Sequence, residues 1–264
     1  MGIFSDFSLK GAKRASFSYF YPMDMDQVLK WTPNALPAVL AIGAVTIGFI
    51  IYYFVMISEK VEARVRGQLD PVAGQARWVI FQRVWGGVVL GLFALLTPVI
   101  GLGKAPWDYG MSFSINGETA LLILGLGVVI VVMNLFRAGS PANLVHYPQI
   151  RLPEWNWRLL LMSSGGWIVY LLGYELMFRG FLLYGCIEVI GIWPAIAINA
   201  AIYSFAHFFK GIGETVGAIP FGVIICVLTL YTGNFMLAFI VHCFLALSNQ
   251  TVAMWKHPEM RFKG

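Results

Sequence analysis

Charged residues are scarce in this 264-residue chain, at 12% of the sequence against 59% hydrophobic residues. An average soluble domain carries roughly 25% charged residues, so this chain lacks the polar side chains to cover a water-facing surface. Strands of alternating apolar and polar residues, which would suggest an outer-membrane barrel, are also missing from the pattern. The sequence therefore predicts an all-α fold, a polytopic helix bundle integral to a membrane.

Cysteine is rare as well. Cys186, Cys226 and Cys243 lie in apolar surroundings and lack CxxC spacing, so they support neither a disulfide framework nor a cysteine metal site. We expect buried free thiols. The net charge of +5 comes mostly from Lys and Arg between the apolar runs. Membrane topology explains this placement, and no nucleic-acid partner is expected.

Seven apolar runs are long enough, or nearly so, for a hydrocarbon core of ~30 Å, and six to eight spans are compatible with the sequence. They lie at about residues 36–57, 78–102, 119–136, 158–190, 193–209, 217–231 and 235–255. The fourth run exceeds one span, so we expect a tilted helix or a break near Gly180 or Gly185. In the second run, Gly87 and Gly91 form a GxxxG packing face, and Arg83 is expected to extend towards the membrane surface.

We divide the chain into three regions of one membrane domain. Residues 1–35 mix aromatic and basic residues and predict an interfacial segment on the bilayer surface. Residues 36–136 are read as accessory transmembrane helices, and residues 158–255 as the functional core. Basic residues in the loops 59–77 and 137–158 and after Trp255 favour a cytoplasmic C-terminus, whereas the basic N-terminal segment opposes it.

Polar side chains within the membrane runs of the last hundred residues are few: Tyr174, Glu175, Arg179, His207, His242 and, near a helix end, Glu214 and Asn249. In the segment LLGYELMFRG, Glu175 and Arg179 are four residues apart, so they project from one helix face and can form an ion pair. A single histidine in a helix is usually structural. A carboxylate, a guanidinium and two imidazoles on successive segments indicate a functional site that faces the bundle interior.

Two chemistries use such a set. A carboxylate beside a histidine in a dry cavity can act as general base on a water molecule. Alternatively, a glutamate and two histidines could bind zinc with one position left for water. The HExxH spacing of common zinc peptidases is absent from the sequence, so the spacing does not support zinc and no cofactor is certain. Transport ranks last, because the chain shows no repeated half.

Three segments, YELMFRGFLL, YSFAHFFKG and TGNFMLAFIVH, resemble in order and spacing the motifs of the CAAX-protease and bacteriocin-processing family of intramembrane peptidases. The resemblance covers about residues 165–250. It implies cleavage of membrane-tethered peptides in a bacterial inner membrane, without a required metal. It also implies a first glutamate and first histidine that activate water, and a second histidine that stabilises the oxyanion with an Asn four residues later.

The chain departs from this pattern at two positions. Tyr174 stands at the first glutamate position, so Glu175 takes the second, and Ala246 replaces the Asn. A tyrosine phenol titrates near ~10 and cannot serve as a base at neutral pH. Losing one oxyanion donor typically costs about 10² to 10³ in rate.

Two interpretations follow from these departures. In the first, the site is rebuilt: Glu175 or Glu214 acts as base with His207, and Asn249 supplies the missing amide. In the second, the polar residues are a buried network in an inactive relative, which binds or scaffolds a partner as a subunit of a membrane complex. We expect a polar cavity between the helices that carry Glu175, His207 and His242.

Overall fold

The structure is a computed structural model that describes residues 26, 30, 32–68 and 70–263. The chain divides into two compact units, Met1–Pro33 and Asn34–Gly264, and the second contains nearly all of the described residues. The interfacial segment expected at residues 1–35 lies almost wholly outside the described residues.

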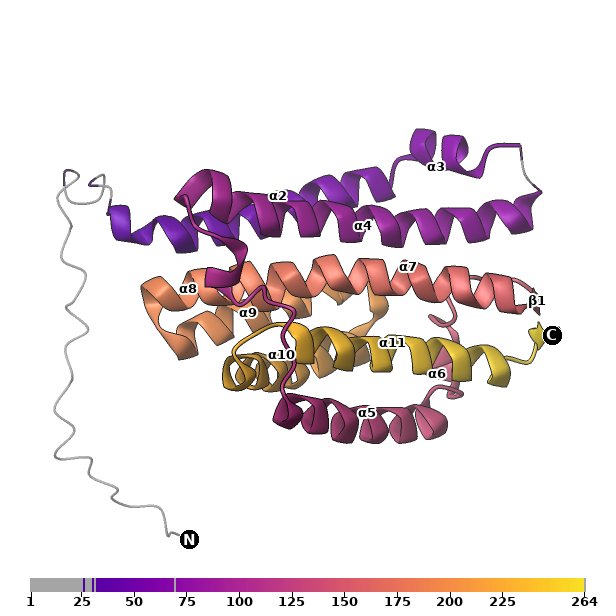
Figure 1. Cartoon of the computed structure of the whole chain (residues 1–264). Helices are drawn as coiled ribbons and strands as arrows, with labels where there is room; N and C mark the ends of the chain where they lie inside the picture. The colour runs from indigo at the N-terminus through magenta and orange to yellow at the C-terminus, as the bar shows by residue number, and fades with distance from the viewer. Residues whose placement is uncertain (1–25, 27–29, 31, 69, 264) are drawn as a thin grey trace, which may run out of the picture. The chain divides into compact units, whose positions relative to one another are not determined.

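Helices make up nearly all of this unit, as predicted (Figure 1). The first half contains η1 (Pro33–Ala35), α2 (Leu36–Met56), α3 (Glu59–Arg66), α4 (Pro71–Leu102), η2 (Pro106–Tyr109), α5 (Gly117–Arg137), α6 (Pro141–Leu144) and β1 (Glu154–Trp155). The second half contains α7 (Trp157–Glu175), η3 (Leu176–Leu182), α8 (Leu183–Ile190), α9 (Ile192–Ala206), η4 (Phe208–Lys210), α10 (Ile212–Thr232), α11 (Met236–Lys256) and β2 (Arg261–Phe262). β1 and β2 form a short parallel pair.

Side-chain caps explain where three of the long helices begin. Asp70 accepts hydrogen bonds from the backbone of Val72 and Ala73 at the start of α4, each at 3.0 Å. Asn116 and Asn156 cap α5 and α7 in the same manner. These polar residues satisfy amides that the first helical turn leaves free, so each helix starts at a fixed position.

Among the described residues, six helices are long and apolar enough to cross a membrane: Pro33–Met56, Pro71–Leu102, Gly117–Arg137, Trp157–Ile190, Ile212–Thr232 and Met236–Lys256. The fourth is one continuous helical run through α7, η3 and α8, and the expected break near Gly180 is instead a π-helical segment, η3. The expected span at residues 193–209 is a shorter helix, α9, of 15 residues.

The path of α9 leads from one end of the bundle to the other. Just before it, Glu188 accepts a hydrogen bond from Tyr109, which belongs to the connection between α4 and α5. Just after it, Glu214 accepts one from Tyr147, in the connection between α5 and α7. These two connections lie at opposite ends of α5, so the part of the chain from α2 to α11 passes along the bundle seven times, with α9 as the shorter pass.

Close backbone contact joins the first helices to the last ones. In Figure 1, α7 lies between α4 and α11, and α5 packs on the far side of α11. A Cβ atom on Gly87 would lie 2.2 Å from the carbonyl oxygen of Val169, and one on Gly173 would lie 1.9 Å from the carbonyl oxygen of Gly87. Only glycine permits this approach, which confirms the predicted packing role of Gly87.

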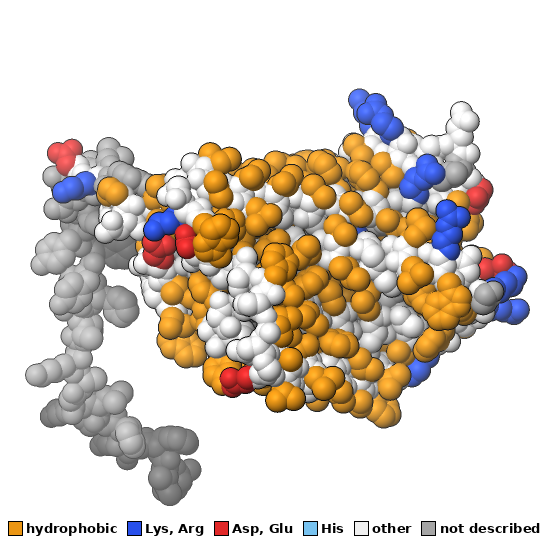
Figure 2. Space-filling view, viewed as in Figure 1, with side chains coloured by type: hydrophobic (Ala, Val, Ile, Leu, Met, Phe, Trp, Pro, Cys, Tyr) orange, Lys and Arg blue, Asp and Glu red, His pale blue; other side chains and the backbone are white. Residues whose placement is uncertain are grey.

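Exposed apolar side chains cover the middle of the bundle, and charges gather at its ends (Figure 2). Lys and Arg cluster at the end with α3 and the C-terminus. The connection that carries Tyr109 lies at the opposite end, where Asp108, Glu118 and Glu188 outnumber Lys104. An apolar belt between two charged ends is the surface expected of a protein that spans a lipid bilayer.

Candidate active site

Glu175 and Arg179 lie where α7 passes into the π-helical segment. Oε2 of Glu175 is 3.3 Å from Nη1 of Arg179, and both side chains are fully buried. The ion pair predicted from their spacing is therefore present. Placing a carboxylate and a guanidinium together offsets much of the cost of burying either charge.

The wider turn of η3 is held by a residue that the sequence analysis did not single out. The carboxamide of Asn199, on α9, donates to the backbone carbonyl of Phe178 at 2.6 Å, and the thiol of Cys226 donates to Asn199 Oδ1 at 3.3 Å. π-Helical turns disturb the regular α-helical hydrogen bonding, so a carbonyl here needs an external donor. An isolated Asn within an otherwise apolar run was the one sequence signal for this role.

His242, on α11, contacts the same carboxylate. Its Nδ1 lies 2.6 Å from Oε1 of Glu175. Because an ionised carboxylate only accepts, we assign the proton to Nδ1, which leaves Nε2 with a lone pair in the neutral ring. A carboxylate that orients a histidine in this manner is the arrangement found in many general bases.

Aromatic rings surround this pair. Tyr174 stacks on Phe178 with ring centroids 4.5 Å apart, and it meets the rings of Tyr203 and His242 edge-on at 5.8 and 5.9 Å. The guanidinium carbon of Arg179 lies 4.3 Å from the centroid of Tyr203, a cation–π contact. Tyr174 therefore forms part of the aromatic wall of the site.

His207 joins the cluster through Tyr203. Its Nδ1 donates to the backbone carbonyl of Tyr203 at 2.9 Å, and the two rings lie 4.6 Å apart. The ring centroids of Tyr203 and His242 lie 6.3 Å apart, so Tyr203 stands between the two histidines in this series of contacts. Since the carbonyl can only accept, Nε2 of His207 is also the nitrogen free to take a proton.

Glu214 and Asn249 make their contacts elsewhere. Glu214 accepts from the hydroxyl of Tyr147 at 3.3 Å and lies 3.8 Å from the ammonium of Lys210. Oδ1 of Asn249 accepts from Asn143 at 3.0 Å. The structure thus brings Glu175, Arg179, His207 and His242 together and places these two side chains in contacts with the connection after α5.

In the described parts of the chain, no group of three or more His, Cys, Asp or Glu residues could hold a metal ion. The three cysteines are free thiols, with Cys186 and Cys226 buried and Cys243 partly buried.

Residues 154–248 match the family model described as type II CAAX prenyl endopeptidase, Rce1-like. This region of the chain is similar to the CAAX-protease family. Comparison with curated proteins and with solved structures gives no match. The matched region begins at β1 and includes every residue of the Glu175, His207 and His242 cluster.

A second polar network joins the CAAX-protease region to α4, and it overturns one expectation. Arg83 is 4% exposed and does not reach the membrane surface. Its guanidinium donates to Ser163 Oγ at 2.8 Å, to Gln250 Oε1 at 3.2 Å and to Gln149 Oε1 at 3.0 Å. The ring of Trp167 lies 4.2 Å from its guanidinium carbon. These neutral partners replace water, so the side chain stays inside the bundle.

A cavity of about 710 Å³ opens between α2 and α9 in front of α7. Its lining includes Tyr170 and Ala206 but not Glu175, His207 or His242. The expected position was between the helices that carry those three residues. There, the rings of Tyr174, Tyr203 and Phe221 pack around His242.

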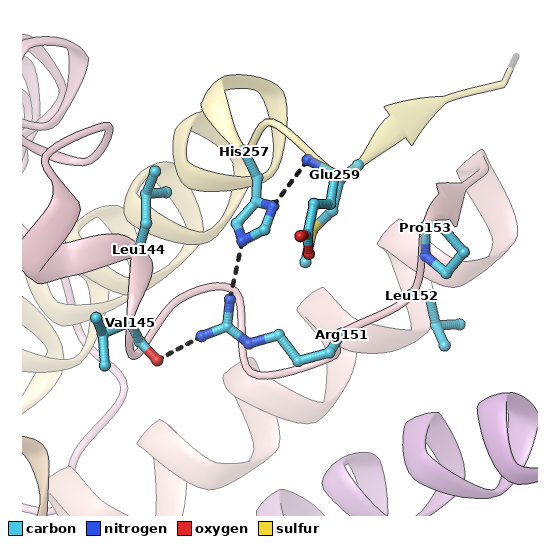
Figure 3. A pocket seen from close by; sticks show the side chains of 8 residues that line it. Leu144, Val145, Arg151, Leu152, Pro153, His257 and Glu259 are labelled. Carbon is cyan, nitrogen blue, oxygen red and sulfur yellow. Dashed lines mark hydrogen bonds between the residues drawn. The ribbon is translucent and has the colours of Figure 1, made fainter.

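A smaller cavity, of about 480 Å³, lies beside the C-terminal segment (Figure 3). Arg151 donates to the carbonyl of Val145 at 2.6 Å and contacts Nε2 of His257 at 3.3 Å, while the amide of Glu259 contacts Nδ1 of the same ring at 3.2 Å. A neutral imidazole accepts at one nitrogen only, so these two ring contacts are not both hydrogen bonds at once.

Proposed function

We propose that the protein is an intramembrane endopeptidase of the CAAX-protease type that hydrolyses membrane-tethered peptides. The observation that carries the proposal is the 2.6 Å contact between His242 Nδ1 and Glu175 Oε1. It supplies an oriented base at a site where the first glutamate of the family pattern is replaced by Tyr174.

The pair divides the work of base and orienting group. His242 keeps 11% of its side chain exposed and Glu175 only 1%, so the imidazole is the more accessible member of the pair. Its Nε2 takes a proton from the water that attacks the scissile carbonyl, and the proton then passes to the leaving amine. Glu175 fixes the ring and stabilises the imidazolium, and Arg179 balances the buried carboxylate. His207, whose ring lies 4.6 Å from that of Tyr203, assists through Nε2 by hydrogen bonding to the water or the oxyanion.

The charged ends give the proposed orientation. Positive residues concentrate at the end with α3, the connection after α5 and the C-terminus. The positive-inside rule then places this end, and the C-terminus, in the cytoplasm. Among membranes, a bacterial inner membrane is the proposed location.

The test uses the full-length protein in proteoliposomes and a panel of acyl-anchored fluorogenic peptides. We expect cleavage by the unmodified protein, and a loss of about 10² or more in rate for His242→Gln and for Glu175→Gln. His257→Gln, outside the cluster, is the matched control and should cleave normally. Equal cleavage by all three variants would exclude the proposed base.

A second candidate function is a non-hydrolytic relative that binds a membrane partner. Tyr174 and Ala246, at the two positions that the family resemblance assigns to catalysis, favour it. Under this alternative, the unmodified protein cleaves nothing in the panel, whereas the variant Tyr174→Glu with Ala246→Asn gains activity. A partner retained at 1:1 stoichiometry by the protein with Glu175→Gln and His207→Ala would support binding without hydrolysis. A protein that purifies alone would count against it.

A further inference from the structure

The cavity between α2 and α9 is amphipathic, and its two ends differ in chemistry. One end is lined by the connection between α5 and α7 and by the end of η4, with His146, Tyr147, Gln149 and Lys210. The rest is lined mainly by apolar side chains of α2 and α9, beside Thr46 and Gln82: Val45, Phe49, Ile50, Phe54, Met56, Ile57, Ile202 and Phe205.

The apolar part opens towards the lipid. Phe205 is 72% exposed, Phe54 63% and Ile50 50%, although all three line the cavity. Exposed apolar side chains on both rims form a lateral opening at membrane depth, through which a hydrocarbon chain can enter without crossing water.

The polar end carries positive charge. Burial disfavours the ammonium form of Lys210, yet the neighbouring Tyr147 and Glu214 outweigh this effect and raise its pKa, so Lys210 stays a cation. A second cation, Arg83, donates two hydrogen bonds to Oε1 of Gln149, which lines the cavity. The hydrogen bonds described for Arg83 all go to neutral oxygens. The nearby carboxylate of Glu214 offsets one of these two charges, which leaves the end of the cavity cationic.

Donors for an anion are present beside this charge. Because Oε1 of Gln149 accepts from Arg83, its NH₂ group is left to donate into the cavity that Gln149 lines. His146 lines the cavity together with Lys210, and its Nε2 lies 3.5 Å from where a Cβ on Gly211, the residue after Lys210, would be. Lys210 also lies 5.9 Å from the ring of Trp167, within reach of a cation–π contact.

We propose that this cavity binds a phospholipid with a negatively charged headgroup. The headgroup phosphate lies against Lys210, His146 and Gln149, and one acyl chain lies along α2 and α9. The volume falls within the range of ~300 to ~1,000 Å³ typical of small-molecule sites. A cationic end joined to apolar walls matches the headgroup and acyl chain of an anionic phospholipid. Binding at this site does not depend on the proposed peptidase activity.

The experiment measures lipid retention by native mass spectrometry on the full-length protein, titrated with dioleoylphosphatidylglycerol or with dioleoylphosphatidylcholine. We expect phosphatidylglycerol to bind about tenfold or more tightly, since one charge-assisted contact is worth roughly that factor. Lys210→Gln should remove the preference, and Lys210→Arg should keep it. Lys60→Gln, an exposed lysine of α3 at the same end, is the matched control and should leave the preference unchanged.

A second pair of variants tests the acyl chain. Phe205→Ala should weaken retention of both lipids, and Phe136→Ala, an equally exposed residue of α5 outside the cavity, should not. Equal binding of the two lipids, or equal behaviour of Lys210→Gln and Lys60→Gln, would overturn the proposal. So would displacement of phosphatidylglycerol by millimolar sodium phosphate, which would indicate a site for the free anion. Binding of an apolar peptide with a free carboxylate, but not of phosphatidylglycerol, would reject the lipid in favour of a peptide.

Discussion

Asn199 donates a hydrogen bond from its carboxamide to the backbone carbonyl of Phe178, across 2.6 Å and 21 positions of sequence. This contact connects α9, which leads to His207, with the π-helical segment that carries Arg179. The two halves of the candidate site are therefore coupled through backbone as well as side chains.

Replacing Asn199 should weaken this coupling. In Asn199→Leu the carbonyl of Phe178 loses its donor inside the bundle, and we expect a loss of about 1–2 kcal/mol in the free energy of unfolding. Thermal unfolding in detergent, followed by circular dichroism, measures it. Cys226→Ala removes only the weak thiol donor and should change the midpoint less. An unfolding midpoint for Asn199→Leu equal to that of the unmodified protein would contradict this role.

Removing one charge of the buried ion pair should cost more than removing both. Glu175→Gln leaves Arg179 as an uncompensated buried cation, so we expect a destabilisation of about 3–5 kcal/mol. In the double variant Glu175→Gln with Arg179→Met no charge remains, and part of the stability should return. A double-mutant cycle on unfolding midpoints provides the comparison, and additive effects would argue against direct pairing.

The contact between α4 and α7 should not tolerate a methyl group. Gly87→Ala places a Cβ 2.2 Å from the carbonyl oxygen of Val169, so the helices must separate. We expect a lower unfolding midpoint, equivalent to about 1–3 kcal/mol. The control is Gly125→Ala on α5, where a Cβ meets no atom within 4 Å and stability should be kept or slightly raised. Similar midpoints for the two variants would refute the close packing.

Lysine should not replace Arg83, even though it keeps the charge. Arg83 holds Ser163, Gln149 and Gln250 with a planar fork, and an ammonium group cannot reach all three. We expect Arg83→Lys to lose about 1–3 kcal/mol of stability. Arg137→Lys, at the exposed end of α5, controls for the substitution itself. A protein as stable as this control would show that the fork geometry is unimportant.

Hydropathy predicted the membrane helices because the length and apolarity of a run can be read from that segment alone, without knowing which helices pack against it. The pairing of Glu175 with Arg179 was likewise predictable, because both belong to one helical turn. The position of Gly87 in a packing face followed from local spacing as well.

Long-range contacts explain what the sequence did not reveal. Arg83 was expected at the membrane surface, and its partners Gln149 and Gln250 lie 66 and 167 positions away. The π-helical turn depends on Asn199, which belongs to another helix. The position of the cavity depends on how the rings of Tyr174, Tyr203 and Phe221 fill space, and spacing alone carries no information about that.

The parallel pairing of β1 and β2 connects the segment after α11 to the segment before α7. Arg261 and Lys263 donate backbone hydrogen bonds to Pro153 and Trp155, at the point where the CAAX-protease region begins. We expect a fluorescent tag or affinity handle attached after residue 263 to leave this strand pairing intact. A tag that replaces residues 261–263 removes the backbone hydrogen bonds to Pro153 and Trp155. We expect this loss to free the segment that precedes α7, the helix that ends at Glu175.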